Sequence, residues 1–304
     1  MSEVVHFDQR FLRMKTSPYQ ISAFTHAARE RSFTKAAERL GVTQSSITQH
    51  VIKLERIMGT QLFIRRRDGL ELTRAGRELF AVSDRLRTLE QLIEEKVDSY
   101  SEIATGHLNV VANAPRPAMP VIAGYVARYP RVQISFALVS WTLAMQQLRE
   151  RTVDIAIVTQ PEADELLYSL PVATTRYRAY VRRGHALAGF KRLSLRDLVN
   201  TPVIVPEDGS LTQQLLHRKC CELGITLPSL VKAATFPLAK EAVLHGVGVG
   251  LLLDDSMSTS RDLIAINIAE MDETYTNCLV TPTDKRELRF VRSFIDVAAQ
   301  VLGV

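Results

Sequence analysis

The strongest constraint on this chain is a pattern for two short helices joined by a tight turn, within residues 33–55. Gly41 ends the first helix, because glycine tolerates the positive φ of a helix end, and Thr43 caps the second. The second helix has an apolar stripe spaced by four and three residues and small polar side chains on its other face. Because a helix with a slim polar front fits the major groove of DNA, the pattern predicts a helix-turn-helix DNA-binding domain.

Positive charge is concentrated in the same part of the chain. The first 76 residues contain thirteen basic and seven acidic residues, a net charge of +6, whereas the whole chain carries +5. Everything after residue 76 is therefore close to neutral. A localised excess of cations around a helix-turn-helix pattern favours binding to the phosphates of double-stranded DNA.

A short hairpin is expected directly after this pattern, in residues 62–73, with an Asp68-Gly69 turn. Arginine side chains on its first strand and tip suit phosphates and a narrow minor groove, as in the wing of a winged helix-turn-helix. The alternative is that this charge run is only a solvated surface. We predict DNA contacts from the polar residues of the helices and from the wing: Thr34, Thr43, Gln44, Ser45, Ser46, Thr48, Gln49, Lys53, Arg65, Arg66 and Arg67.

A long helix is predicted from Arg74 to about Ile103, where proline is absent and apolar residues recur at steps of three and four. Such sustained spacing is typical of a coiled-coil seam and predicts a dimer, which would place two recognition helices about a two-fold axis. An amphipathic helix that packs on its own domain is the alternative. The seam positions are Leu79, Val82, Leu86, Leu89, Ile93, Tyr100 and Ile103, with Lys96 at the position that breaks the pattern.

The last two hundred residues alternate between strand and helix patterns after a hinge at Thr105-Gly106. Alternation of this kind predicts an α/β domain built on a parallel sheet. Three glycines at 246, 248 and 250 precede a strand rather than follow one, so they indicate a close-packed turn and not a nucleotide-binding loop.

Several classes of protein are excluded by what the sequence lacks. It contains no Gly-x-Ser-x-Gly or Walker motif and no Cys/His spacing typical of zinc sites, so we expect no catalytic residues, no metal and no cofactor. No apolar run approaches the roughly 20 residues that cross a bilayer, and the N-terminus lacks the apolar region of a signal peptide. Three cysteines form no disulfide framework, which favours a reducing location. Together these features predict a cytoplasmic protein with no membrane partner. A redox role for the adjacent Cys220 and Cys221 is the minor alternative.

At this point the residues resemble a known family, the LysR-type transcriptional regulators. Residues 32–63 are similar to its N-terminal signature, S-F-T-x-A-A-x-x-L followed by V-T-Q-S-S-I-T-Q-x-V-x-x-L-E-x-x-x-G-x-x-L-F, and residues 72–76 match its L-T-x-A-G. Looser likeness extends over the C-terminal part, in Leu195-Arg-Asp-Leu, in Gly209-Ser210 and in the glycines from 246 onward. The chain departs from the family at Gln49, where many members have Arg, at Ser45, where Pro is frequent, and at Ala114-Pro115-Arg116-Pro117, which lacks the usual hydroxyl residue.

The resemblance implies the fold: an N-terminal all-α winged helix-turn-helix, a long linker helix, and a C-terminal α/β effector domain of two subdomains like periplasmic binding proteins. On that layout the DNA-binding domain spans 1–76 (motif 17–76), the linker 77–104 and the effector domain 105–304. Its first subdomain comprises 105–175 and 270–304, and its second 176–269. The resemblance also implies a homodimer or homotetramer on promoter DNA and a small metabolite that changes DNA binding or bending.

An effector in such a domain is expected at the C-terminal ends of strands, near helix N-termini. These N-termini favour an anion, so we predict a small carboxylate or phosphonate-like effector. The alternatives are that Arg116 is a surface cation and that the hydroxyl residues are only helix caps. The predicted contacts are Arg116, Ser140, Trp141, Thr142, Ser210, Thr212 and Phe236.

The sequence therefore predicts a metabolite-responsive, sequence-specific transcriptional regulator. The alternatives are a non-specific nucleoid-type DNA-binding protein and, less favoured, a metabolite-binding protein or enzyme with a DNA-binding appendage. Sequence-independent binding would fall steeply with salt and ignore base sequence, which separates the first alternative from a regulator.

Overall fold

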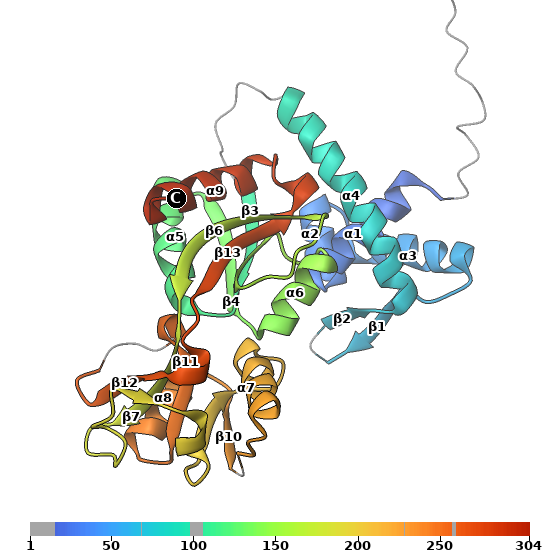
Figure 1. The fold of residues 1–304 in the computed structure, drawn as a ribbon. Coiled ribbons are helices and arrows are strands. Elements are labelled where there is room, and N and C mark those ends of the chain that lie inside the picture. The colour runs from blue at the N-terminus through green and yellow to red at the C-terminus, as the bar shows by residue number, and fades with distance from the viewer. Residues whose placement is uncertain (1–15, 68, 98–105, 228, 257–259) are drawn as a thin grey trace, which may run out of the picture. The chain divides into compact units, whose positions relative to one another are not determined.

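The computed structural model describes residues 16–67, 69–97, 106–227, 229–256 and 260–304, except for the side chain of Asp255 (Figure 1). The chain divides into two compact units. The first comprises Met1–Val97 with Glu150–Thr152, and the second Asp98–Arg149 with Val153–Val304.

In the part of the first unit that the structure describes, the first elements are the helices α1 (Pro18–Glu30), α2 (Phe33–Leu40) and α3 (Gln44–Met58). Each starts at a hydroxyl residue whose side chain accepts a backbone N–H of the first turn. Ser17 forms a capping box with Gln20, Ser32 caps α2, and Thr43 caps α3. Two hydroxyl residues, Ser32 and Thr34, lie at the start of α2, and Ser32 is the one that caps the helix. Gly41 ends α2 with φ of +64°, as its sequence position predicts.

An antiparallel hairpin follows, formed by β1 (Phe63–Arg66) and β2 (Gly69–Leu72). Gly69 has φ of +137°, and a Cβ at this position would lie 2.7 Å from the carbonyl oxygen of Arg31. That carbonyl accepts a hydrogen bond from the N–H of Leu70 at 2.9 Å, which ties the wing to the end of α1. The predicted Asp68-Gly69 turn includes Asp68, which lies outside the described residues.

The core of this unit joins α1 and α3 to the wing and to the start of α4 (Arg74–Val97). Phe24, Leu54 and Phe80 are fully buried, and the rings of Phe24 and Phe63 lie 5.4 Å apart. Burial of this apolar surface fixes which face of α3 remains exposed, because Ile47 and Val51 also point into the core.

His26, on α1, gives this unit a predicted acid sensitivity. Burial, and then the charges of Arg87, Arg29 and Arg39, lower the pKa of His26 to about 4 from 6.5. As pH falls below 6.5 the unfolded chain takes up a proton before the folded chain does, so stability present above pH 6.5 is lost between about 6.5 and 4. After solvent screening is allowed for, we expect a loss of about 1 kcal/mol by pH 5. Urea unfolding of the full chain between pH 7.5 and 5 should show this loss, His26→Gln should remove it, and His245→Gln should not; an unchanged loss in His26→Gln would contradict the assignment.

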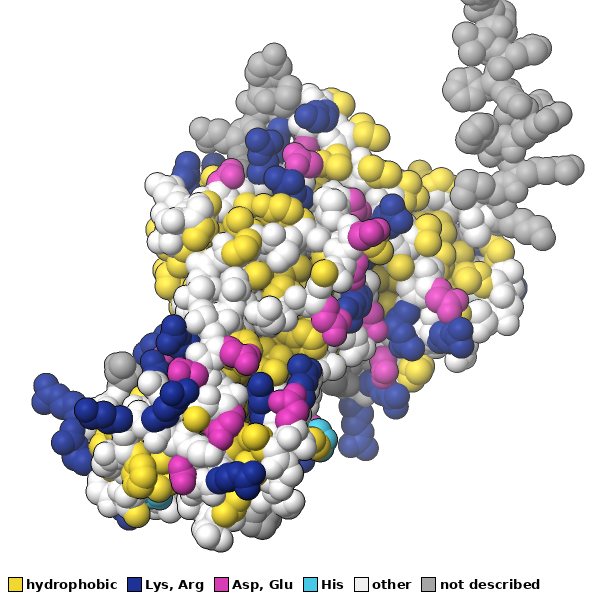
Figure 2. Space-filling model, in the orientation of Figure 1, with side chains coloured by type: hydrophobic (Ala, Val, Ile, Leu, Met, Phe, Trp, Pro, Cys, Tyr) yellow, Lys and Arg dark blue, Asp and Glu magenta, His cyan; other side chains and the backbone are white. Residues whose placement is uncertain are grey.

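Helix α4 carries an exposed apolar stripe. Leu89 is 55% exposed and Ile93 is 64% exposed, and Figure 2 shows apolar side chains on the surface of this helix. Leu79 was predicted to belong to the same seam, but it packs against the core of the first unit. Tyr100 and Ile103, the last two predicted seam positions, lie outside the described residues. The described stripe consists of Val82, Leu86, Leu89, Ile93 and Val97.

Among its described residues, the second unit contains two mixed sheets, of five and six strands. The first sheet has the order β4 (Val132–Leu138), β3 (Gly106–Ala112), β5 (Ile155–Thr159), β13 (Tyr275–Pro282) and β6 (Leu167–Thr175). The second has the order β10 (Leu230–Ala233), β9 (Val203–Pro206), β11 (Val249–Leu253), β7 (Tyr177–Arg182), β12 (Leu263–Ile268) and β8 (Arg192–Leu193).

The prediction of a parallel sheet is therefore only half right. The pairs β3·β4 and β3·β5 are parallel, but β13 pairs antiparallel with both β5 and β6, and β7 pairs antiparallel with β11 and β12. The cause is topological: the chain leaves the first sheet after β6, builds the second, and returns as β13 beside β5. A local strand-helix pattern does not encode the direction of such a return.

Among its described residues, the second unit also contains the α-helices α5 (Pro115–Arg128), α6 (Trp141–Arg149), α7 (Leu211–Leu223), α8 (Phe236–Leu244) and α9 (Arg289–Leu302). Short 3₁₀ segments add η2 (Leu195–Leu198), η3 (Asp254–Ser256), η4 (Ala269–Met271) and η5 (Thr283–Lys285). After α8, Gly246 has φ of +76°, and a Cβ on Gly248 would lie 2.1 Å from the carbonyl oxygen of Pro202. These glycines thus form a close-packed turn. On α7, Cys220 is buried and Cys221 exposed.

Candidate functional site

The outer face of α3 presents a row of exposed polar side chains. Gln44, Ser45, Gln49 and Lys53 are exposed, and the buried stripe lies on the opposite side of the helix. Glutamine can pair bidentately with adenine, and lysine can neutralise a phosphate. The face therefore has the chemistry for reading bases in a major groove.

Some of the hydroxyl side chains predicted to contact DNA form hydrogen bonds within α3 and its cap instead. Thr43 accepts the backbone N–H of Ser46 at 3.3 Å and lies 3.0 Å from the hydroxyl of Ser45. The hydroxyl of Thr48 donates to the carbonyl oxygen of Gln44 at 3.0 Å, and both Thr48 and Ser46 are half-buried. Thr34, on α2, is exposed. Gln44 and Gln49 are thus better placed than Thr48 to reach a base edge.

Two further exposed residues on this face, Ile52 and Arg56, were not predicted from the sequence. Ile52 is 45% exposed although it lies among polar neighbours. An apolar side chain there can contact a thymine methyl group, and Arg56 adds a cation at the same side of the helix. Their positions three and seven residues after Gln49 place them on the same helical face as Gln49, and this spacing could have identified them from the sequence.

The three wing arginines differ in their surroundings. The Arg65 guanidinium lies 5.6 Å from the centre of the Phe33 ring, and the Nε of Arg66 donates to Glu71 at 2.8 Å. Arg67 is exposed and forms no ion pair among the described residues. Arg67 is therefore the wing cation with most freedom to meet a phosphate.

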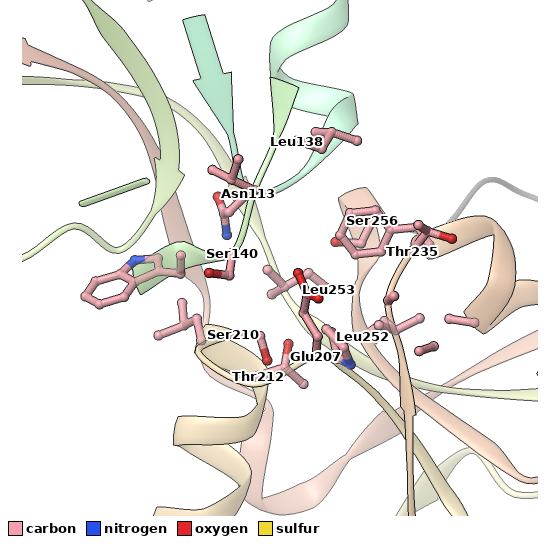
Figure 3. Close-up of a pocket in the computed structure, with 18 of the residues that line it drawn as sticks. Asn113, Leu138, Ser140, Glu207, Ser210, Thr212, Thr235, Leu252, Leu253 and Ser256 are labelled. Atoms are coloured by element: carbon pink, nitrogen blue, oxygen red, sulfur yellow. The ribbon is translucent and has the colours of Figure 1, made fainter. Parts of the chain in front are cut away.

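A cavity of about 150 Å³ opens in the second unit, where the ends of β4, β9, β10 and β11 come together (Figure 3). Its wall includes the residues at the starts of α6, α7 and α8. Five of the seven predicted effector contacts line it: Ser140, Trp141, Ser210, Thr212 and Phe236.

The other two predicted contacts, Arg116 and Thr142, do not line the cavity. The guanidinium of Arg116 donates instead to the carbonyl oxygen of Asp254 at 3.3 Å. The hydroxyl of Thr142 donates to the carbonyl oxygen of Gly209 at 2.9 Å, and its backbone N–H donates to the same oxygen at 3.2 Å. Both residues therefore bond backbone oxygens beside the cavity.

Trp141 belongs to both the core and the cavity wall. Its indole N–H donates to the carbonyl oxygen of Thr159 at 2.8 Å, and the side chain is almost fully buried. The hydroxyls of Ser210 and Thr235 cap α7 and α8 by accepting backbone N–H groups. Several lining residues were not predicted as contacts, because they come from strand ends and loops far apart in the chain: Asn113, Leu138, Glu207, Leu252, Leu253 and Ser256.

Among the described residues, no group of three or more His, Cys, Asp or Glu side chains is arranged to hold a metal ion. The helices in the same part of the chain include none that is long and apolar enough to span a membrane.

Comparison with known proteins places both units. Residues 19–77 match the family model of the bacterial regulatory helix-turn-helix protein of the LysR family, and residues 102–303 match that of the LysR substrate binding domain. The chain belongs to the LysR family. As a LysR-family protein it is a sequence-specific DNA-binding transcriptional regulator with an effector-binding domain, not an enzyme. This agrees with the function predicted from the sequence.

Individual relatives support the same assignment. The HTH-type transcriptional regulator BbuR of Bordetella bronchiseptica is 25% identical over 295 residues, covering 93% of this chain and 90% of the relative. YofA of Bacillus velezensis, another HTH-type transcriptional regulator, is 29% identical over 279 residues, covering 90% of this chain and 93% of the relative. A full-length OxyR variant from Pseudomonas aeruginosa has the same fold, with a TM-score of 0.77 at 17% identity over 95% of this chain and 97% of that one.

Proposed function

We propose that this LysR-family regulator reads its operator with the exposed face of α3, holds the flanking backbone with the wing, and responds to a small molecule bound in the cavity between β4, β9, β10 and β11. The observation that supports DNA reading most is the exposure of Gln44 and Gln49 on a helix whose opposite face is buried. LysR regulators bind promoter DNA and small-molecule effectors and form oligomers. A structure of the relative CbnR was solved with its target DNA.

The exposed stripe on α4 supports a homodimer as the binding unit. Two copies of a helix with apolar residues at this spacing cover each other's stripes in a coiled coil. A homotetramer would be built from two such dimers. The domain limits of 1–76, 77–104 and 105–304 remain our proposal for how these roles divide along the chain.

The anionic effector predicted from the sequence stays a prediction. Its support is that the first turns of α6, α7 and α8 contribute to the cavity wall, since helix N-termini favour negative charge.

Base reading by Gln44 has a direct test. Gln44→Ala should remove a bidentate base contact and weaken binding to the best operator by about 1–3 kcal/mol, while leaving binding to unrelated DNA nearly unchanged. Competition binding with the operator and with shuffled DNA of equal composition measures both affinities. An equal loss on both DNAs would contradict base reading by this residue.

Arg67 should behave in the opposite way. Arg67→Ala should weaken binding to all sequences alike and lower the slope of log K against log salt by about one unit, because one phosphate contact is lost. The matched control is Arg131→Ala, an exposed arginine of the second unit that should change neither quantity. A sequence-selective loss in Arg67→Ala would instead assign this arginine to base recognition.

A further inference from the structure

The cavity has one charged side chain among the described residues that line it, the carboxylate of Glu207. This residue follows β9 and is exposed, and Figure 3 shows its carboxylate pointing into the space between the labelled residues. Neither lysine nor arginine nor histidine is part of the described lining. The electrostatic character of the site is therefore negative.

The cationic side chains near the cavity are bonded to groups outside its lining. The guanidinium of Arg116 donates to the carbonyl oxygen of Asp254 at 3.3 Å, outside the lining. The Nζ of Lys232 lies 2.8 Å from a carboxylate oxygen of Asp208. An entering anion would meet Glu207 without a cation beside it.

The N-termini of α6 and α8 also offer an anion few donors. In α8 the second residue is Pro237, which has no N–H, and the N–H of Leu238 is bonded to the Thr235 hydroxyl. In α6 the N–H of Thr142 is already bonded to the carbonyl oxygen of Gly209 at 3.2 Å. Because backbone N–H groups are what makes a helix start attract anions, their loss weakens that attraction.

The rest of the wall is largely apolar and aromatic. Leu138, Leu252 and Leu253 line the cavity together with the aromatic residues Trp141 and Phe236. A volume of about 150 Å³ is close to that of a cavity which accepts benzene. Aromatic rings also attract cations through their faces.

We propose that the effector of this regulator is a small, ring-sized apolar amine whose protonated nitrogen lies beside Glu207 and whose apolar body packs against Phe236 and the leucines. This inference rests on the proposed function, because it takes the cavity as the effector site. It differs from the anion predicted from the sequence, which rested on the helix N-termini and counted Arg116 among the expected contacts.

Trp141 makes the test specific, because it is the single tryptophan of the chain and lies in the cavity wall. The full-length protein is titrated with benzylamine, benzyl alcohol and benzoate, three probes of one size that differ in charge, while tryptophan fluorescence is recorded. Benzylamine should bind more tightly than benzoate by about fivefold or more, with benzyl alcohol between them.

Two charge-neutralising variants are expected to differ in their effect on benzylamine binding. Glu207→Gln should weaken the binding of benzylamine by about three- to fivefold and strengthen the binding of benzoate. Arg116→Gln should change the affinity for benzylamine little. Both residues are exposed, so neither change should disturb folding.

If benzoate bound more tightly than benzylamine, or if Arg116→Gln abolished benzoate binding, the proposal of an amine effector would be overturned. The cavity would still be the effector site. No fluorescence change with any probe, in a protein that still binds DNA, would remove the cavity itself and overturn this inference together with that part of the proposed function.

Discussion

Replacing Leu89 by glutamate is expected to convert the protein into a monomer and to weaken binding to a two-half-site operator by about 100-fold or more. Leu89 lies in the middle of the exposed apolar stripe of α4 and is 55% exposed. In a dimer the substitution would place two carboxylates in an apolar seam, where they are neither solvated nor paired. A monomer loses the second half-site as an intramolecular contact, and linked binding accounts for about 10²–10⁴ in affinity.

Sedimentation and operator binding measured on the same samples test this expectation. Leu89→Ile keeps the seam apolar and should retain both the dimer and the affinity. Because Leu89 is largely exposed in a single chain, Leu89→Glu should keep its circular dichroism spectrum. A folded variant that remained dimeric with full affinity would show that α4 is not the dimer contact.

Lys285→Ala is expected to destabilise the second unit by about 3–5 kcal/mol. The Lys285 side chain is fully buried at the end of η5, and its Nζ lies 2.9 Å from a carboxylate oxygen of Asp154. The other carboxylate oxygen of Asp154 accepts the backbone N–H of Asn109 at 3.0 Å, so the ion pair joins β3 to the segment after β13. Removing the lysine leaves a largely buried carboxylate without this partner.

Urea unfolding followed by the fluorescence of Trp141 reports on this unit. Lys191→Ala, at an exposed position, is the control and should cost less than about 0.5 kcal/mol. The double variant Lys285→Met with Asp154→Leu should recover part of the loss, since an apolar pair replaces a buried ion pair at little cost. A loss below about 1 kcal/mol in Lys285→Ala would contradict a structural role for the pair.

Signals that act within a few residues allowed the DNA-binding unit to be predicted from the sequence. Thr43 and Gly41 have capping roles that depend only on their own helix ends, and the buried face of α3 follows from apolar spacing. Ile52 was not predicted, because an apolar residue on an exposed face is an exception to the rule that apolar spacing marks the buried face of a helix. Such exceptions are expected where a surface is used for binding.

The cavity depended on contacts that the sequence does not display. Ser140, Ser210 and Phe236 were found because helix starts after strands are recognisable. Glu207 was not among the predicted contacts, because it lies in the loop after β9 and neither caps nor starts a helix. Arg116 occupies the predicted helix start, but its long side chain reaches Asp254 instead of the cavity. Side-chain direction is set by tertiary packing, which spacing along the chain does not determine.

The most direct test of the central claim is DNase footprinting of the purified protein on the DNA upstream of its own gene, at near-physiological salt. The account predicts a protected stretch of several helical turns that contains an imperfect palindrome, and loss of that selectivity in Gln44→Ala. Uniform protection that ignores sequence and disappears as salt rises would contradict it, because phosphate contacts alone would then explain the binding.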